Sequence, residues 1–179
     1  NDAKIMSHSM GEGVSIRIGI YEIHDTSIEV EQMVDRAFLA ADSIKGHYND
    51  LVAVYDDQLR SQLLYEQTLT STMAEGIDKE QFLVYLQPKY DIATNRLAGA
   101  EALVRWDHPI YGLIYPGSFI PMFEQNGFIT TLDNYIWEKT CQIISKWKKE
   151  GYPLFPVSVN VSRADIYHPD LCEKLVDLI

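Results

Sequence analysis

The sequence has 179 residues, of which 46% are hydrophobic and 23% are charged, and its formal net charge is −11. This composition is typical of a folded chain with enough apolar residues for one sizeable core or two small ones, and it excludes extended disorder. The acidic balance argues against a nucleic-acid polymer as partner, because no basic stripe is available to neutralise phosphates.

The cysteines and the hydropathy pattern bear on the compartment. Cys141 and Cys172 show no CxxC or Cys/His spacing, which argues against a disulfide framework or a structural zinc site. No window of 18 consecutive apolar residues and no signal-peptide pattern are present. We therefore expect a cytoplasmic segment without membrane contact, and a membrane anchor upstream in a longer parent protein stays open.

A strand, a helix and a second strand are predicted first along the chain. Val14–Ile23 has the alternation of a strand, and Leu51–Tyr55 is a short second strand. Between them, Ser27–Ile44 carries apolar residues at helical spacing, with Ser27 as the predicted N-cap and Gly46 as the C-terminal stop. The result is a small strand–helix–strand unit.

A connecting helix is predicted next, from Gln58 to about Thr72, and Gly76–Lys79 is expected to break the pattern. We interpret residues 58–79 as a linker. Its apolar stripe fits packing on the next domain as well as it fits a hinge or a short coiled coil, and both readings stay open.

Two strands joined by a turn follow the linker. Phe82–Gln87 alternates and is expected to end at Pro88, while Asp91–Arg96 supplies a turn into the strand Leu97–Trp106. The two strands predict a hairpin that places Gln87 and the Glu101 face in one sheet.

The strand Leu97–Trp106 carries two charges on one face. Period-two alternation puts Glu101 and Arg105 on the same side, and the opposite side is wholly apolar. Charges beside a core need partners, so these residues indicate a ligand or metal site. A structural Glu101–Arg105 pair is an equally good reading of these two residues alone.

The remaining elements are expected in the order helix, helix, strand, helix. After a loop beyond Trp106 come helices at Ser118–Gln125 and Thr131–Glu150, the strand Val157–Ser162, and a final helix that opens near Pro169. Alternating strands and helices after residue 80 are typical of a β/α-repeating fold, in which functional residues gather at the carboxyl ends of parallel strands.

Asn160 lies near such a strand end and is expected to share one mouth of the fold with Glu101. A carboxylate oxygen and an amide oxygen suit Mg²⁺ or Mn²⁺ better than zinc, and a nearby Arg suits phosphate. An Asn at this place is also a common turn or capping residue, which stays the alternative.

Four blocks follow one another along the chain: Phe82–Pro88, the run Glu-Ala-Leu-Val-Arg-Trp at Glu101–Trp106, Pro116–Glu124, and Val157–Ser162. Together and in this order, they resemble the EAL family of bacterial cyclic di-GMP phosphodiesterases. The resemblance implies an α/β fold, the first half of a modified TIM (β/α) barrel with an antiparallel first strand, over residues 80–179. It also implies second-messenger signalling through hydrolysis of cyclic di-GMP to linear pGpG by metal-activated water.

The same resemblance assigns roles to single residues. Glu101 and Asn160 become ligands of Mg²⁺ or Mn²⁺, while Gln87, Leu103 and Arg105 contact cyclic di-GMP. A homodimer through the EAL domain is implied as well. The family's later acidic ligands and its general base are not among these 179 residues, so no catalytic residue is assigned here and no turnover is expected from this segment alone. A catalytically inactive cyclic di-GMP receptor is the alternative function.

The front of the chain contains the segment Arg17–Ile20 and the run Val34–Asp42. With these two stretches, residues 1–57 resemble the C-terminal part of a GGDEF domain, a partial α+β unit. Arg17 replaces the Ser that is usual in that family, and Leu39 and Asp42 stand where Tyr and Lys are common. The departures imply a degenerate regulatory or nucleotide-sensing domain without cyclase activity.

Overall fold

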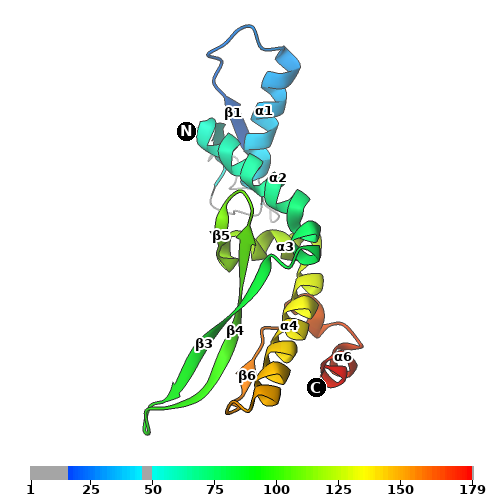
Figure 1. Ribbon diagram of the computed structural model, residues 1–179. Helices are drawn as coiled ribbons and strands as arrows, with labels where there is room; N and C mark the ends of the chain where they lie inside the picture. Colours follow the sequence, from blue (N-terminus) through cyan, green and yellow to red (C-terminus); the bar gives the residue numbers. More distant parts are fainter. Residues whose placement is uncertain (1–15, 46–49, 179) are drawn as a thin grey trace, which may run out of the picture. The chain divides into compact units, whose positions relative to one another are not determined.

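The computed structural model describes residues 16–45 and 50–178, and the chain divides into two compact units, Asn1–Tyr65 and Glu66–Ile179 (Figure 1). The expectations for Val14 and for the stop at Gly46 concern positions outside the described residues, as does the final residue, Ile179. Each unit is described by itself.

The first unit has the predicted strand, helix and strand. Strands β1 (Ile18–Tyr21) and β2 (Val52–Tyr55) pair in parallel, with Ile18 opposite Val52, and α1 (Val30–Ser43) connects them. A parallel pair requires such a crossover, and the helix covers one face of the two strands.

The predicted cap of α1 is wrong. The backbone N–H and the hydroxyl of Ser27 both donate to Asp25 Oδ1, at 2.8 and 2.6 Å. Ser27 therefore completes a turn closed by the Asp25 carboxylate, and the helix begins later, with Glu29 at the N-cap and no side-chain cap bond.

Helix α2 (Asp57–Asp78) is longer than predicted, because Gly76 does not break it. Gly76 is buried, and a Cβ there would lie 2.8 Å from a ring carbon of Phe82 and 3.1 Å from Trp106 Nε1. The glycine lets the last turn of the helix lie against these two rings, and this close packing offsets the low helix propensity of glycine.

The second unit is built on a four-stranded sheet. Strand β4 (Arg96–His108) pairs with β3 (Phe82–Asp91) and β5 (Gly112–Ile114) in antiparallel fashion, and with β6 (Val157–Ser158) in parallel. The hairpin is confirmed. These strand directions agree with an antiparallel first strand followed by parallel ones.

Strand β3 runs through Pro88, where the sequence predicted its end. Pro88 pairs with Ala100, and β3 has only β4 as a neighbour within the described residues. An edge strand accepts a proline whose nitrogen faces away from its single partner, so pairing continues to Asp91.

An aromatic cluster fills the core beneath one end of the sheet. Phe82, Trp106, Phe119 and Phe123 are all nearly or fully buried, and their ring centroids lie 4.6 to 6.1 Å apart. Such offset and edge-on ring contacts stabilise a core beyond the area that they bury.

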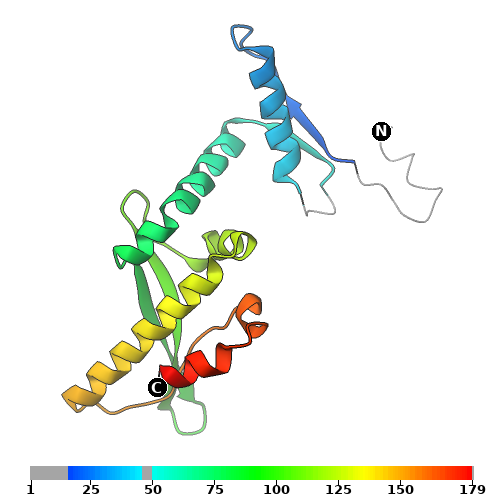
Figure 2. The same cartoon turned by 90° about the vertical axis from the view of Figure 1, so that its right-hand side faces the viewer.

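Helices cover the apolar face of the sheet. The turn of η2 (Pro116–Ser118) leads into α3 (Ile120–Asn126), and α4 (Ile129–Glu150) then runs along the hairpin (Figure 2). Helix α4 begins two residues before the predicted start and ends at the predicted residue, where Gly151 takes the left-handed conformation at φ 78°.

The last segment differs from the single strand and helix predicted for it. Only β6 pairs as a strand, after which α5 (Arg163–Ile166) and α6 (Leu171–Asp177) follow. Helix α6 begins at Leu171 with Asp170 at the N-cap, so Pro169 lies before the helix and not at its first position. None of the helices within the described ranges combines the length and apolar composition needed to cross a bilayer.

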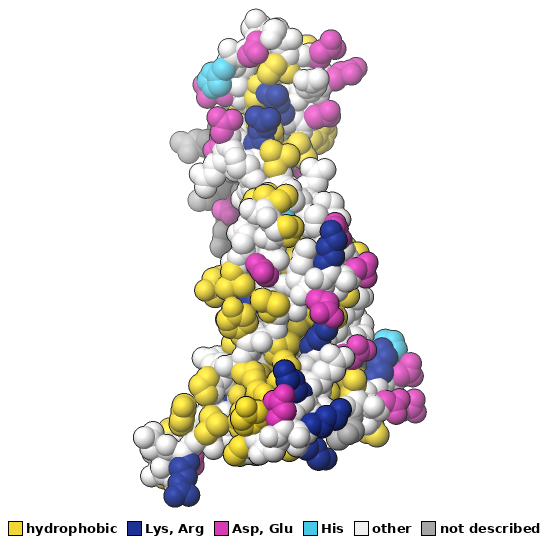
Figure 3. Space-filling view, viewed as in Figure 1, with side chains coloured by type: hydrophobic (Ala, Val, Ile, Leu, Met, Phe, Trp, Pro, Cys, Tyr) yellow, Lys and Arg dark blue, Asp and Glu magenta, His cyan; other side chains and the backbone are white. Residues whose placement is uncertain are grey.

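The face of the sheet away from the helices is open. Leu83, Tyr85, Leu113 and Tyr115 on or beside its strands are exposed, and hydrophobic side chains gather over this sheet in Figure 3. Glu101 and Arg105 belong to the same face, since Leu83 pairs with Arg105.

Candidate functional site

The register of the hairpin places the predicted site residues on one face. Gln87 is directly opposite Glu101, and Tyr85 is opposite Leu103. Paired residues of an antiparallel sheet point to the same side, so Gln87, Glu101, Leu103 and Arg105 share the open face. The apolar alternate residues Ala100, Ala102 and Trp106 are buried on the other face, as predicted.

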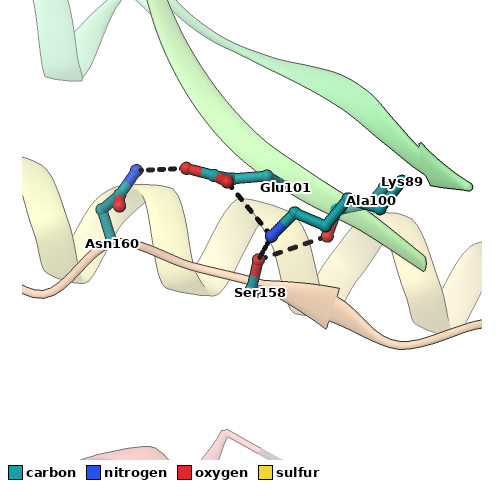
Figure 4. A network of polar contacts seen from close by, with 5 residues as sticks. All are labelled: Lys89, Ala100, Glu101, Ser158 and Asn160. Carbon is teal, nitrogen blue, oxygen red and sulfur yellow. Dashed lines mark hydrogen bonds and ion pairs between the residues drawn. The ribbon is translucent and has the colours of Figure 1, made fainter. Parts of the chain in front are cut away.

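Glu101 lies at the centre of a polar network (Figure 4). Asn160 Nδ2 donates to Glu101 Oε1 at 3.4 Å, and Lys89 Nζ lies 3.1 Å from Glu101 Oε2. Lys89 also donates to Ser158 Oγ at 2.8 Å, and that hydroxyl donates to the Ala100 carbonyl at 3.3 Å. Residues 59 positions apart along the chain thus meet at one carboxylate.

Strand β6 brings Asn160 to Glu101 because it pairs closely with β4. The Ala100 N–H donates to the Pro156 carbonyl at 3.0 Å, and a Cβ on Gly99 would lie 2.8 Å from the same oxygen. The glycine therefore permits this pairing. Beyond β6, Trp137 Nε1 donates to the Asn160 carbonyl at 2.9 Å and anchors the backbone of Asn160 to α4.

The charge state of Glu101 follows from these contacts. Lys89, by hydrogen bond and by charge, and to a smaller extent the Asn160 amide, lower the pKa of the Glu101 carboxyl below its ordinary value. Glu101 is therefore an ionised carboxylate at neutral pH, which is the form that binds a cation.

Arg105 does not pair with Glu101 within the described residues. Its Nη1 donates to the Val104 carbonyl at 2.7 Å, and its guanidinium lies over the rings of Tyr115 and Tyr85, at 4.8 and 5.6 Å from their centroids. The reading of a structural Glu101–Arg105 pair is therefore wrong, because the salt bridge of Glu101 is made by Lys89.

A second polar cluster was missed in the sequence. The Asp133 carboxylate accepts from the Ser162 N–H at 2.9 Å, and the Ser162 hydroxyl donates to Asp165 at 2.6 Å. Burial and the neighbouring Asp165 carboxylate raise the pKa of Asp133 to about 7. The motif Ser162-x-x-Asp165 is a helix-start signal that could have located half of this cluster.

A pocket of about 270 Å³ adjoins Asn160. Its lining is mainly apolar and includes Leu103, but Glu124 and Asp133 also face it. The pocket lies between β4 and the helices α3 and α4, and of the predicted site residues only Leu103 and Asn160 line it.

The residues present fit a hard divalent cation in part. Glu101 and Asn160 offer oxygen donors within reach of one another, and a cation, the Lys89 ammonium, already lies against Glu101. Over residues 16–45 and 50–178, no group of three or more His, Cys, Asp or Glu side chains is arranged to hold a metal. Two oxygens alone would hold such an ion weakly, since it takes about six.

Lys89 is the other residue that the sequence analysis missed. Ending the strand at Pro88 removed Lys89 from the sheet, whereas continued alternation through the proline places it on the same face as Gln87.

Comparison with known proteins gives a family match. The model described as the EAL domain matches residues 70–179. The chain is 25% identical over 176 residues to the bifunctional diguanylate cyclase/cyclic di-GMP phosphodiesterase MucR of Pseudomonas aeruginosa, covering 96% of this chain and 25% of MucR. It is 37% identical over 114 residues to an uncharacterized protein of Mycobacterium tuberculosis H37Rv, covering 63% of this chain and 37% of that protein.

Solved structures show the same likeness. A PaMucR phosphodiesterase in complex with c-di-GMP has a TM-score of 0.58 at 28% identity, over 62% of this chain and 45% of that one. The Xanthomonas citri FimX EAL domain in complex with c-diGMP has a TM-score of 0.57 at 14% identity, over 66% and 46% respectively, which supports the fold alone. The chain spans between about a quarter and two fifths of the length of these two curated relatives.

Proposed function

Because the chain belongs to the EAL domain family, we propose that it is part of a GGDEF–EAL signalling protein that hydrolyses cyclic di-GMP to linear pGpG. The observation that carries this proposal is the meeting of Glu101 on β4 with Asn160 just after β6, where Asn160 Nδ2 lies 3.4 Å from Glu101 Oε1, on the face that also presents Gln87 and Arg105. An acidic and amide oxygen pair beside an arginine suits a phosphodiester with a divalent ion.

Glu101 and Asn160 would hold Mg²⁺ or Mn²⁺ in this proposal. A bound divalent ion supplies activation of water and neutralisation of charge at phosphorus. The chain's part is to present an ionised Glu101 and to keep the Asn160 backbone fixed through the bond from Trp137. For the amide oxygen of Asn160 to face an ion, its Nδ2 must turn away from Glu101.

Arg105, Gln87 and Leu103 would contact the nucleotide. The Arg105 guanidinium is planar and held between Tyr115 and Tyr85, which fixes its approach to a phosphate. Gln87 supplies amide hydrogen bonds one strand away, and Leu103 supplies apolar surface. The unit before Tyr65 would be the degenerate GGDEF-like part, with a regulatory role and no cyclase activity.

Binding to the 179-residue chain tests the nucleotide assignment. Arg105→Ala should weaken cyclic di-GMP binding roughly 10- to 100-fold in isothermal titration calorimetry, the size of a lost charged hydrogen bond. Arg96→Ala is the matched control, since it removes the same charge from the other end of β4 and should leave the Kd unchanged. Equal affinity of the wild type and Arg105→Ala would refute this role.

Hydrolysis tests the enzyme assignment in the longer protein that carries this chain. With Mg²⁺ or Mn²⁺ present, wild type should produce pGpG, and Glu101→Ala should lower kcat by at least about 100-fold. The 179 residues alone should show no turnover. In their described part, Glu101 does not belong to any group of three or more His, Cys, Asp or Glu side chains that could hold a metal ion. Robust turnover by these residues alone would contradict the proposed ligand set.

The small number of metal donors on the open face favours the second candidate, a catalytically inactive receptor of cyclic di-GMP. A face with few metal donors can still bind a nucleotide through Gln87 and Arg105. Tight binding by the longer protein, without pGpG in the presence of either metal, would select the receptor over the enzyme.

A further inference from the structure

We propose that Lys89 is a positioning residue and an internal counter-cation for Glu101: its ammonium neutralises the carboxylate in the absence of metal and competes with a divalent ion for it. The inference rests on the proposed function, which assigns Glu101 to the metal. It adds a residue that sets how tightly the metal is held.

The register of the hairpin brings the side chain of Lys89 close to Glu101. In the register of the hairpin, Lys89 is opposite Gly99, which carries no side chain, and Glu101 is the next residue of β4 on the same face. The register shifts directly after Lys89, between Lys89 and Tyr90, and such irregularities redirect a side chain along the sheet. Lys89 and Glu101 thus form a diagonal cross-strand pair of opposite charge.

A second contact holds the ammonium in place. Ser158 Oγ accepts from Lys89 at 2.8 Å, and its own hydroxyl proton points to the Ala100 carbonyl at 3.3 Å. Figure 4 shows the ammonium between the hydroxyl of β6 and the carboxylate of β4. The ammonium is therefore bound by β4, which carries Glu101, and by β6, which leads into Asn160.

The arrangement satisfies both oxygens of Glu101 without a metal. Lys89 occupies the Oε2 side, and the Asn160 amide N–H occupies the Oε1 side. A divalent ion that binds this carboxylate has to displace a positive charge 3.1 Å from it or share the carboxylate with that charge, and either choice weakens its binding. The Lys89 side chain is 50% exposed, so it can withdraw into water when the ion binds.

Direct Mn²⁺ binding by the 179-residue chain tests the inference, with free Mn²⁺ measured by electron paramagnetic resonance. Lys89→Met should lower the Kd for Mn²⁺ roughly three- to tenfold, the size expected for release from a partly exposed ion pair. Lys89→Arg keeps the charge and should bind close to wild type. A role limited to packing of the side-chain stem would instead leave Lys89→Met unchanged.

Lys139→Met is the matched control. Lys139 makes an ion pair with Glu80 at 2.6 Å in the same unit, so its replacement changes the net charge equally without touching Glu101. Its Kd should stay within about twofold of wild type, because the Lys139 ammonium neutralises Glu80 and not Glu101. Equal tightening in both Met variants would overturn the inference, since general electrostatics would then explain it.

Glu101→Gln separates the two proposals. In one outcome, Glu101→Gln abolishes Mn²⁺ binding, but Lys89→Met binds Mn²⁺ no more tightly than wild type. This result would overturn the role of Lys89 and leave the metal site standing. Absence of Mn²⁺ binding in wild type and Lys89→Met alike would overturn the metal site and the role of Lys89 together. Folding of every variant is checked by its circular dichroism spectrum.

Discussion

His108 is buried at the end of β4, and its hydrogen bonds fix the tautomer of the neutral ring. Nδ1 accepts from the N–H groups of Ile110 and Tyr111 at 3.2 and 3.4 Å, so the ring proton is on Nε2 and faces Thr72 Oγ1 at 3.1 Å. Burial lowers the pKa of His108 below 6.5. A protonated ring would lose both backbone donors, so acid should loosen the turn between β4 and β5.

The lowered pKa predicts acid sensitivity. Above pH 6.5 the ring is neutral in both states, and as the pH falls below 6.5 the unfolded chain gains a proton that the folded chain resists, so stability is lost. His108→Asn should flatten this slope between pH 6.5 and 4.5 in urea unfolding, at a cost of about 1–3 kcal/mol at pH 7.5. His168→Asn, at an exposed histidine, should keep the wild-type slope.

Asp133 changes stability with pH in the opposite direction to His108: it makes the protein less stable as the pH rises. Its pKa is raised from 3.8 to about 7, so the folded chain retains a proton that the unfolded chain has lost above pH 4, and the associated stability disappears as the pH rises through 7. Asp133→Asn should therefore gain stability relative to wild type between pH 5 and pH 8 in the same assay. A constant difference across that range would show that Asp133 does not titrate there.

The roles of His108, Asp133 and Lys89 could not be predicted from the sequence pattern. Apolar alternation and the Glu-Ala-Leu run pointed to Gln87, Glu101, Arg105 and Asn160, which the structure places on β3, on β4 and just after β6. The partners of Glu101 and Asp133 are set by contacts 12 to 59 residues apart along the chain, and no local period encodes such contacts.

At the scale of elements, the close spacing between β4 and β6 depends on a glycine, Gly99, which has no Cβ. Gly99 lies against the Pro156 carbonyl, and the strand that follows Pro156 carries Ser158 and leads into Asn160. Any Cβ at position 99 has to push β6 away from β4, because the atom that it meets belongs to the backbone.

Gly99→Ala should therefore lower the free energy of unfolding by about 1–3 kcal/mol and weaken Mn²⁺ binding at the same time. Gly117→Ala is the control, since a Cβ at Gly117 meets nothing within 4 Å, and it should change stability by no more than about 0.5 kcal/mol. Unchanged stability and metal affinity in Gly99→Ala would mean that β6 shifts freely.

Helices and strands were predictable where their hydrophobic periodicity extended over enough residues to be recognised. Helix α4 and the hairpin follow the sequence closely, whereas β5 has three residues and fell within a predicted loop. Gly76 and Pro88 misled the prediction because propensity describes an isolated segment, while ring packing on α2 and the edge position of β3 override it.

At the scale of the whole molecule, the two units differ in core size. Among the described residues, the buried hydrophobic side chains of Asn1–Tyr65 are Ala40 and Ile44, whereas Glu66–Ile179 contains the aromatic cluster and the buried residues of α4. The apolar residues Ile18, Ile20, Val52 and Val54 of the first unit are exposed. Stability per unit should follow buried apolar area.

Differential scanning calorimetry should therefore resolve two transitions, with the first unit melting at the lower temperature. His108→Asn should move only the upper transition, because His108 and Thr72 both belong to Glu66–Ile179. A single transition that His108→Asn shifts as a whole would indicate one cooperative unit instead.

The hydrogen bond between Trp137 and the Asn160 carbonyl gives the site an intrinsic optical reporter. Trp137 is 2% exposed, and its indole N–H donates to the backbone of a proposed metal ligand. A shift of Asn160 on binding an ion or a nucleotide would stretch that bond and alter the emission of this indole. The protein therefore carries its own fluorophore at the candidate site, and occupancy can be followed without a label.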